Sequence, residues 1–158
     1  MKTSTIKGVS FGLTSGIITT LGMMVGLNFS TGSKLVVLGG ILTIAIADAF
    51  SDALGIHVSE EAEGRHSHQE IWLATLATFL SKLGFALTFV IPVLVFRLPT
   101  AVMVSLVWGL LVLGVISYLM GKDQEVKTYK VVMEHLSIAL LVIVITYFVG
   151  SWIAKYFN

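Results

Sequence analysis

The residues that decide the fold are Leu35 to Ile56, LVVLGGILTIAIADAFSDALGI, in which Asp48 and Asp52 are the only charged side chains. The hydrocarbon core of a bilayer is about 30 Å thick, and a helix that crosses it needs roughly 20 apolar residues in succession. This stretch has that length and composition. It therefore predicts a transmembrane helix with two acidic groups in its second half.

Four further stretches have the same apolar character, and polar or charged segments separate them. They run approximately over Gly8 to Leu27, Ile71 to Phe96, Ala101 to Gly121 and Val131 to Tyr156. The sequence therefore predicts an all-α integral membrane protein, with five transmembrane helices in a single domain embedded in a lipid bilayer.

The composition agrees with this fold class. Of 158 residues, 56% are hydrophobic and 12% are charged, against about 25% charged residues in a typical globular domain. So few charges cannot cover a soluble domain, which excludes soluble enzymes and nucleic-acid-binding proteins. The chain has no cysteine, and it contains no P-loop, dinucleotide fingerprint, nucleophile elbow or HExxH motif. We therefore expect neither an enzyme nor a bound cofactor.

The basic residues predict which side of the membrane each loop faces. Five spans place the termini on opposite sides, and cytoplasmic loops carry the excess of Lys and Arg. One side holds Lys2, Lys7, Arg65, Lys122, Lys127 and Lys130, and the other holds Lys34, Arg97 and Lys155. We therefore expect a cytoplasmic N-terminus, in the cell membrane if the organism is prokaryotic.

Three ionisable side chains lie deep inside predicted spans: Asp48, Asp52 and Lys82. Each costs about 2.5 to 3.5 kcal/mol at a helix centre on insertion scales. At 1.5 Å per residue, Asp48 and Lys82 both lie about 16 to 18 Å from the cytoplasmic surface and can meet. Two interpretations stay open: a self-neutralising ion pair, or a site for a cation or proton. In the second case we expect Lys82 to neutralise Asp48, which leaves Asp52 free to bind the ion.

A stripe of polar residues follows one face of the second helix if this helix continues beyond the membrane surface. Steps of 100° per residue place within it Asp48, Asp52, Gly55, Ser59 and Glu63. Hard oxygen ligands in this order suit a path for a divalent cation, with the three carboxylates as ligands and Ser59 along the path. The alternative is a solvated helix end that happens to be acidic.

The segment from His57 to Glu70 contains three histidines and four glutamates. Their spacing fits no ligand template, so a solvated hairpin is the favoured interpretation. We expect this segment to bind divalent metal at best weakly, because a short loop must be ordered when the metal binds. Changing His66 and His68 to alanine should then alter metal binding little.

Small residues recur every four positions in the first span, at Gly8, Gly12 and Gly16 and again at Gly22 and Gly26. This spacing lets helix backbones approach closely, within a subunit or across a dimer. We expect a parallel homodimer that is formed through the first helix.

Two further residues in the spans, Met23 and Pro92, predict a candidate metal ligand and a helix bend. Met23 offers a thioether to a soft metal, although methionines in apolar spans usually only fill space. Pro92 predicts a bend near the outer end of the third span, because proline removes a helical hydrogen bond.

Several short motifs resemble the vacuolar iron transporter family. They are Gly16-Ile17-Ile18-Thr19-Thr20, Ala47-Asp48-Ala49-Phe50-Ser51 with Ala53-Leu54-Gly55, Leu76-Ala77-Thr78-Phe79-Leu80-Ser81 running to Pro92, and Tyr147-Phe148-Val149-Gly150. The resemblance covers nearly the whole chain. It implies a homodimer whose first helices line a path at the subunit interface. It also implies export of ferrous iron, and often manganese, from the cytosol in exchange for protons.

This chain departs from the family pattern at positions that bear on the ion path. Ser15 and Asp52 stand where the family has an aspartate and a methionine, Ile56 replaces an acid, and Lys82 replaces an apolar residue. The glutamate-rich cytosolic domain of many members is also missing between the second and third spans. Of the family's carboxylates on these helices, Asp48 alone matches.

Two functional hypotheses follow from these residues. The first is a transporter of divalent metal ions that uses Asp52 as the relocated carboxylate, with Asp48 as a second ligand or as the partner of Lys82. In this hypothesis Ser15, Ser59 and Lys82 belong to the ion path and its coupling. The second is a membrane scaffold or assembly protein that does not transport and has a salt-bridged Asp/Lys core.

Overall fold

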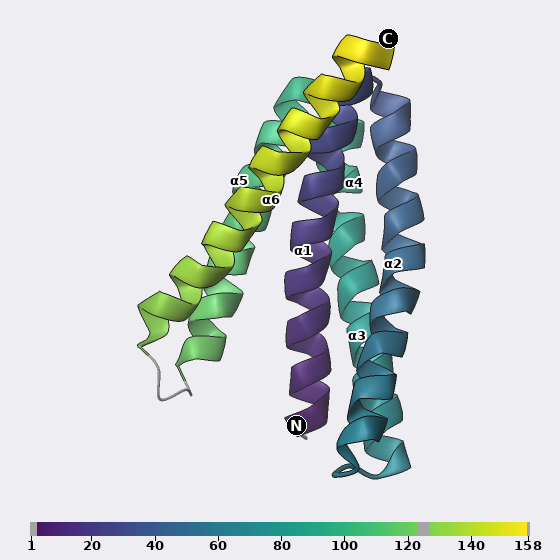
Figure 1. The fold of residues 1–158 in the computed structure, drawn as a ribbon, viewed down its shortest axis with the longest axis vertical. Coiled ribbons are helices and arrows are strands. Elements are labelled where there is room, and N and C mark those ends of the chain that lie inside the picture. The colour runs from purple at the N-terminus through teal and green to yellow at the C-terminus, as the bar shows by residue number, and fades with distance from the viewer. Residues whose placement is uncertain (1–2, 123–126, 158) are drawn as a thin grey trace.

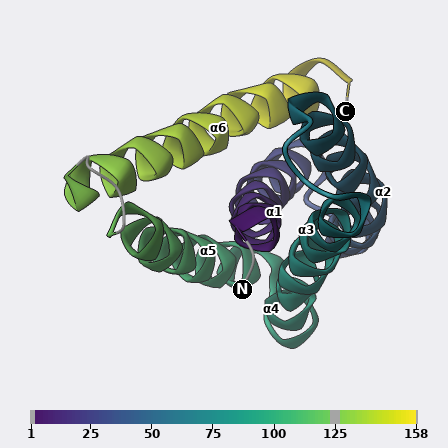
Figure 2. The ribbon, with the colours of Figure 1, turned by 90° about the horizontal axis from the view of Figure 1, so that it is seen from below.

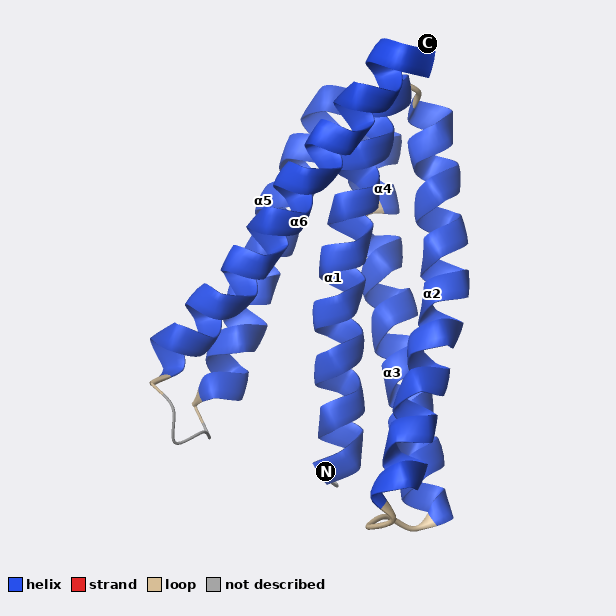
Figure 3. Ribbon diagram, viewed as in Figure 1, coloured by secondary structure: helices blue, strands red, loops and turns tan. Residues whose placement is uncertain are grey.

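The computed structural model describes residues 3–122 and 127–157, and within them the chain is almost entirely α-helical. The helices are α1 (Thr3–Thr31), α2 (Lys34–Glu63), α3 (His68–Thr88), α4 (Val90–Val95), α5 (Leu98–Gly121) and α6 (Thr128–Phe157). Figure 3 shows helices joined by short loops, with no strand in the part of the chain that is described.

Five segments of the described chain are long and apolar enough to cross a membrane. They are Ser4–Thr31, Lys34–Glu63, His68–Val95, Leu98–Gly121 and Thr128–Phe157. Each corresponds to one predicted span, so the prediction of an all-helical chain with five segments of membrane-spanning length and composition is confirmed. Consecutive segments run in opposite directions, and the two termini lie at opposite ends of the bundle (Figure 1). We call the end that holds the N-terminus the N-terminal end.

The second span is much longer than its apolar stretch. The predicted hairpin loop from His57 to Glu70 is wrong, because α2 continues to Glu63 and only residues 64–67 lie between α2 and α3. Gly64 ends α2 in the left-handed conformation, with φ +63°. Ser67 then starts α3 through a capping box with Glu70. The loss of hydrophobicity after Ile56 marks where the apolar stretch ends, but glutamate and alanine remain good helix formers.

The third span is interrupted, as Pro92 predicts. α3 ends at Thr88, Phe89 lies in a turn, and α4 begins at Val90. Pro92 has no N–H to donate to the carbonyl of Thr88 four residues earlier, so a continuous α-helix cannot pass through this point with its hydrogen bonds intact. The bend lies near the end of the bundle opposite to the N-terminus (Figure 1).

α1 is the central helix of the bundle. It packs against α2, α3, α5 and α6, and the view along the bundle shows it surrounded by them (Figure 2). α5 and α6 pack on each other, and this pair leans away from α1 towards the N-terminal end (Figure 1). The side chains of α1 therefore lie between α2 and α3 on one side and the α5–α6 pair on the other.

The first three glycines of α1 lie against α3 within the same chain. A Cβ atom on Gly8 would come 2.4 Å from the carbonyl oxygen of Ala74, and one on Gly12 would come 2.5 Å from that of Thr78. Only glycine permits this approach of the two backbones. The face of α1 that carries Gly8, Gly12 and Gly16 is thus used inside the subunit, and it gives no support to a dimer formed through that face.

The later small residues of α1 serve the contact with α6. A Cβ atom on Gly22 would come 2.7 Å from Val142, and Gly26 lies against Thr146. A Cβ on Gly150 of α6 would come 2.4 Å from the carbonyl oxygen of Gly26. The glycines of α1 therefore pack within the subunit, the first three against α3 and the last two against α6.

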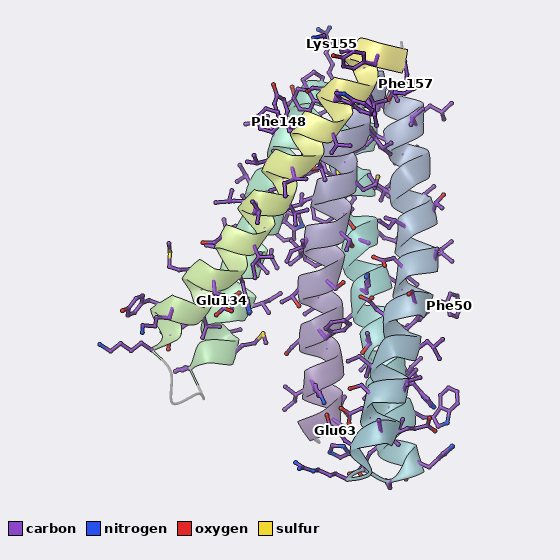
Figure 4. All side chains as sticks on the ribbon, in the orientation of Figure 1. Phe50, Glu63, Glu134, Phe148, Lys155 and Phe157 are labelled. Carbon is purple, nitrogen blue, oxygen red and sulfur yellow. The ribbon has the colours of Figure 1, made fainter. Side chains whose placement is uncertain are left out.

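The outer surface of the bundle is apolar. Figure 4 shows Phe50 and Phe148 at the outer surface of α2 and α6, where they are 62% and 63% exposed. The ring of Phe50 also packs against Phe79 of α3. Exposed large hydrophobic side chains occur on all the long helices. Such a surface suits lipid rather than water as its surroundings.

Candidate functional site

The three deep ionisable residues meet at one point. The Nζ atom of Lys82 lies 2.5 Å from Oδ2 of Asp48 and 2.5 Å from Oδ2 of Asp52. Lys82 also donates a hydrogen bond of 2.9 Å to Oγ of Ser15. The lysine side chain is 1% exposed, while Asp48 and Asp52 are 26% and 18% exposed. We call these four residues the central site.

Three helices position the central site at the middle of their length. Asp48 is 14 residues from the start of α2 and 15 from its end, which is about 21 to 23 Å along the helix. Asp48 and Asp52 are four residues apart, so both side chains project from the same face towards α3. Lys82 is likewise near the middle of the third span, between His68 and Val95.

The prediction that Lys82 pairs with only one of the two aspartates is wrong. Lys82 was expected to neutralise Asp48 and to leave Asp52 free, but its ammonium contacts both carboxylates at the same distance. The reason is that Nζ lies between two acidic groups one turn apart on α2. With all three groups ionised, the cluster carries a net negative charge, because one ammonium faces two carboxylates.

The backbone of α1 makes room for the lysine. Gly16 lies beside the Lys82 stem, and a Cβ atom there would be 3.2 Å from Cγ of Lys82. Because glycine has no side chain, the long apolar part of the lysine can run across α1 while its ammonium reaches α2. Ser15, the neighbour of Gly16, then accepts the third contact of the ammonium.

Asp48 is also reached from outside the bundle. It lines a shallow, open depression of about 470 Å³ together with Met23 of α1 and residues of α2 that include Thr43, Ala47 and Ser51. Met23 is therefore near the central site, as the sequence allowed. Its thioether also fills space against Gly40, where a Cβ atom would lie 2.6 Å from the sulfur.

The predicted polar stripe along α2 is not continuous. Gly55 and Ser59 are exposed, and a Cβ atom at Gly55 would meet no other group within 4 Å. The buried face at this level carries Ile56 and Glu60 instead. Ser59 therefore does not join the central site to Glu63, because the neighbouring helices cover a different face of α2.

A second cluster lies at the N-terminal end and includes the predicted ligand Glu63. The Nζ atom of Lys7 lies 2.6 Å from Oε1 of Glu60 and 2.7 Å from Oε1 of Glu63. Nδ1 of His66 lies 2.8 Å from Oε2 of Glu60. We call Lys7, Glu60, Glu63 and His66 the terminal cluster. Figure 4 shows Glu63 at this end of α2, beside the start of α1.

Lys7 and Glu60 were not predicted as site residues, although a signal for Glu60 exists in the sequence. The buried face of α2 passes through Ala49, Ala53 and Ile56, and the next step of the same periodicity is Glu60. The side chain of Glu60 is completely buried. A carboxylate at a core position of an amphipathic pattern is the mark of a specific interaction.

The other two histidines of the predicted loop do not join this cluster. Nδ1 of His57 lies 2.9 Å from Oγ1 of Thr75, and its ring packs edge-on against Trp72. His68 accepts a hydrogen bond from Trp72. Of the three histidines, only His66 comes together with acidic groups that can share a metal ion.

Comparison of the sequence with models of known protein families and with curated proteins finds no match. The structure shows an all-helical chain with five segments long and apolar enough to cross a membrane and with two clusters of charged residues, and the function is inferred from these clusters.

Proposed function

We propose that the protein is a membrane transporter of divalent transition metal ions, with ferrous iron and manganese as expected substrates. The observation that carries this proposal is the sharing of one ammonium, on Lys82, by two carboxylates at the middle of membrane-crossing helices. Such groups are costly in a bilayer and mark ion or proton pathways. Lys82 balances only one of the two carboxylates. A bound cation or a proton balances the remaining negative charge.

The ligand set fits the proposed cargo. Asp48 and Asp52 supply hard oxygen ligands, and Met23 supplies a thioether beside the same depression. Ferrous iron and manganese accept oxygen ligands readily, and iron also tolerates a softer sulfur ligand. An arriving cation displaces the ammonium of Lys82 from the carboxylates, and Ser15 is already placed to accept the ammonium.

The resemblance to the vacuolar iron transporter family adds the direction and the coupling to this proposal. The protein exports metal from the cytosol in exchange for protons, with its N-terminus in the cytoplasm. Asp52 is the carboxylate that exchanges a proton for the metal. Asp48 and Lys82 remain as a neutral pair when that proton is bound.

The transporter of this proposal is a homodimer whose two copies meet over the depression at Asp48. A carboxylate that is 26% exposed beside lipid at mid-membrane is unfavourable unless something covers it. Exposed small residues of α2 line the depression at a spacing of four, namely Thr43, Ala47 and Ser51, and the exposed Gly39 continues the same series. Small residues at this spacing allow two helices to approach closely. α1 contributes Met23 to this surface rather than its glycines.

One observation favours a second candidate, a membrane scaffold that does not transport. Both carboxylates and the ammonium of the central site are already in contact, so the site can act as a permanent internal ion pair. In that case the charges hold α1, α2 and α3 together, and no ion has to enter.

Reconstitution of the purified protein in liposomes separates the two candidates. The transporter takes up Mn²⁺ or Fe²⁺ under an imposed proton gradient, whereas the scaffold shows no flux above empty liposomes. The Asp52→Asn variant serves as the internal control, because it removes the exchanging carboxylate and keeps the Asp48–Lys82 pair.

A further inference from the structure

The terminal cluster brings metal-binding atoms of three residues together at the N-terminal end of the bundle. Carboxylate oxygens of Glu60 and Glu63 and a ring nitrogen of His66 all lie within 4.8 Å of one another. Three atoms that bind one transition metal ion at bonds of about 2.1 Å lie roughly 3 to 3.6 Å from one another. A closing movement of about 1 Å is therefore enough for these atoms to share one ion.

The buried carboxylate of the cluster is held by ion-pair contacts. Glu60 is completely buried, with Oε1 beside the ammonium of Lys7 and Oε2 2.8 Å from Nδ1 of His66. Lys7 bridges Glu60 and Glu63. A buried carboxylate depends on a positive charge beside it, and a metal ion can supply that charge in place of the ammonium.

We propose that Glu60, Glu63 and His66 form a binding site for a divalent transition metal ion, which displaces the ammonium of Lys7. Two carboxylates and a neutral imidazole match the charge of a divalent ion. Mixed oxygen and imidazole ligands suit Zn²⁺, Fe²⁺ and Mn²⁺. Lys7 occupies the cation position when no metal is bound, so the metal and the ammonium compete for the same oxygens.

The fold holds these ligands nearly in place before the metal arrives. Glu60 and Glu63 are on the continuous helix α2, and Gly64 and the Ser67–Glu70 capping box fix the turn that carries His66. The expectation of weak binding assumed a loop that must be ordered when the metal binds. Because only residues 64–67 lie outside the helices, the entropic cost is smaller and His66 contributes more than the sequence indicated.

This site is separate from the central site and does not depend on transport. Glu60 is eight residues beyond Asp52 on α2, which is about 12 Å along the helix. The side chains of Ala53 and Ile56 are buried on the face between them. Binding at the terminal cluster is therefore expected whether or not the central site moves an ion.

Titration calorimetry of the full-length protein in detergent with Zn²⁺, and electron paramagnetic resonance with Mn²⁺, test the site. Glu60→Gln and His66→Ala should each weaken binding about tenfold or more. Glu61→Gln and His68→Ala are matched controls, since they change an adjacent carboxylate and a nearby imidazole outside the cluster, and they should leave binding unchanged. Lys7→Met should strengthen binding, because it removes the competing ammonium.

The same measurements can overturn the proposal. It is wrong if the wild-type protein binds neither ion, if His66→Ala binds as the wild type does, or if Lys7→Met weakens binding. His66 lies in the turn between helices, so His66→Ala remains informative even if Glu60→Gln does not fold. Asp52→Asn should abolish flux and keep this binding, so a failure of transport and a failure of this site are distinguishable.

Discussion

The ammonium of Lys82 lies 2.5 Å from the carboxylate of Asp52, although 30 residues separate the two in the sequence. α2 and α3 run antiparallel, and the turn at residues 64–67 is near the midpoint between these residues. The middle of one helix therefore lies beside the middle of the next. In this register the ammonium of α3 contacts the carboxylates of α2, so substitutions at Asp52 or Lys82 are expected to affect stability.

Asp52→Asn should abolish metal uptake while the fold is retained. The variant removes one carboxylate and leaves Asp48 to neutralise Lys82, so no unpaired charge remains in the membrane. Uptake of Mn²⁺ into proteoliposomes is the measurement. Ser59→Ala, at an exposed position outside the central site, should transport as the wild type does. Undiminished uptake by Asp52→Asn would rule out the proposed role of this carboxylate.

Lys82→Met should destabilise the protein strongly. It leaves two carboxylates close together in the membrane without a cation, and loss of one partner of a buried ion pair costs about 3 to 5 kcal/mol. Thermal unfolding in detergent, followed by size-exclusion chromatography, measures the loss. The triple variant that combines Lys82→Met with Asp48→Asn and Asp52→Asn removes all three charges and should recover most of the stability. If Lys82→Met is as stable as the wild type, the ion pair does not hold the helices together.

Gly12→Ala should loosen the contact between α1 and α3. The new Cβ atom would lie 2.5 Å from the carbonyl oxygen of Thr78, so the backbones must move apart. Overpacking of this kind typically costs about 1 to 3 kcal/mol. Gly84→Ala is the matched control, because nothing lies within 4 Å of its Cβ position. The control should be neutral or slightly stabilising. Equal unfolding temperatures for the two variants would contradict this packing of α1.

Ala47→Cys should form a disulfide-linked dimer in membranes on mild oxidation. Ala47 borders the depression at Asp48, where the second copy is proposed to lie. The chain contains no cysteine, so a single introduced thiol reports on one surface only. Leu111→Cys on α5, a position that is 59% exposed and lies away from the depression, should remain a monomer. Cross-linking at Leu111 but not at Ala47 would place the interface elsewhere.

The five membrane-crossing segments could be predicted from the sequence because one physical quantity governs them. A helix that crosses about 30 Å of hydrocarbon needs roughly 20 apolar residues, and each such run is visible in the chain. The deep position of Asp48, Asp52 and Lys82 followed from the same count. The interruption at Pro92 also followed, because the missing N–H is a property of the residue itself.

Only the tertiary structure decided which groups pair and which faces are covered. Lys82 contacts both aspartates because α3 places its ammonium between two turns of α2. The glycines of α1 face α3 and α6, a choice that the four-residue spacing leaves open. Glu60 belongs to an acidic helix end in the sequence, yet the fold buries it beside Lys7 and His66. Hydropathy measures how each residue meets solvent or lipid, whereas burial and pairing depend on neighbours that are distant in the chain.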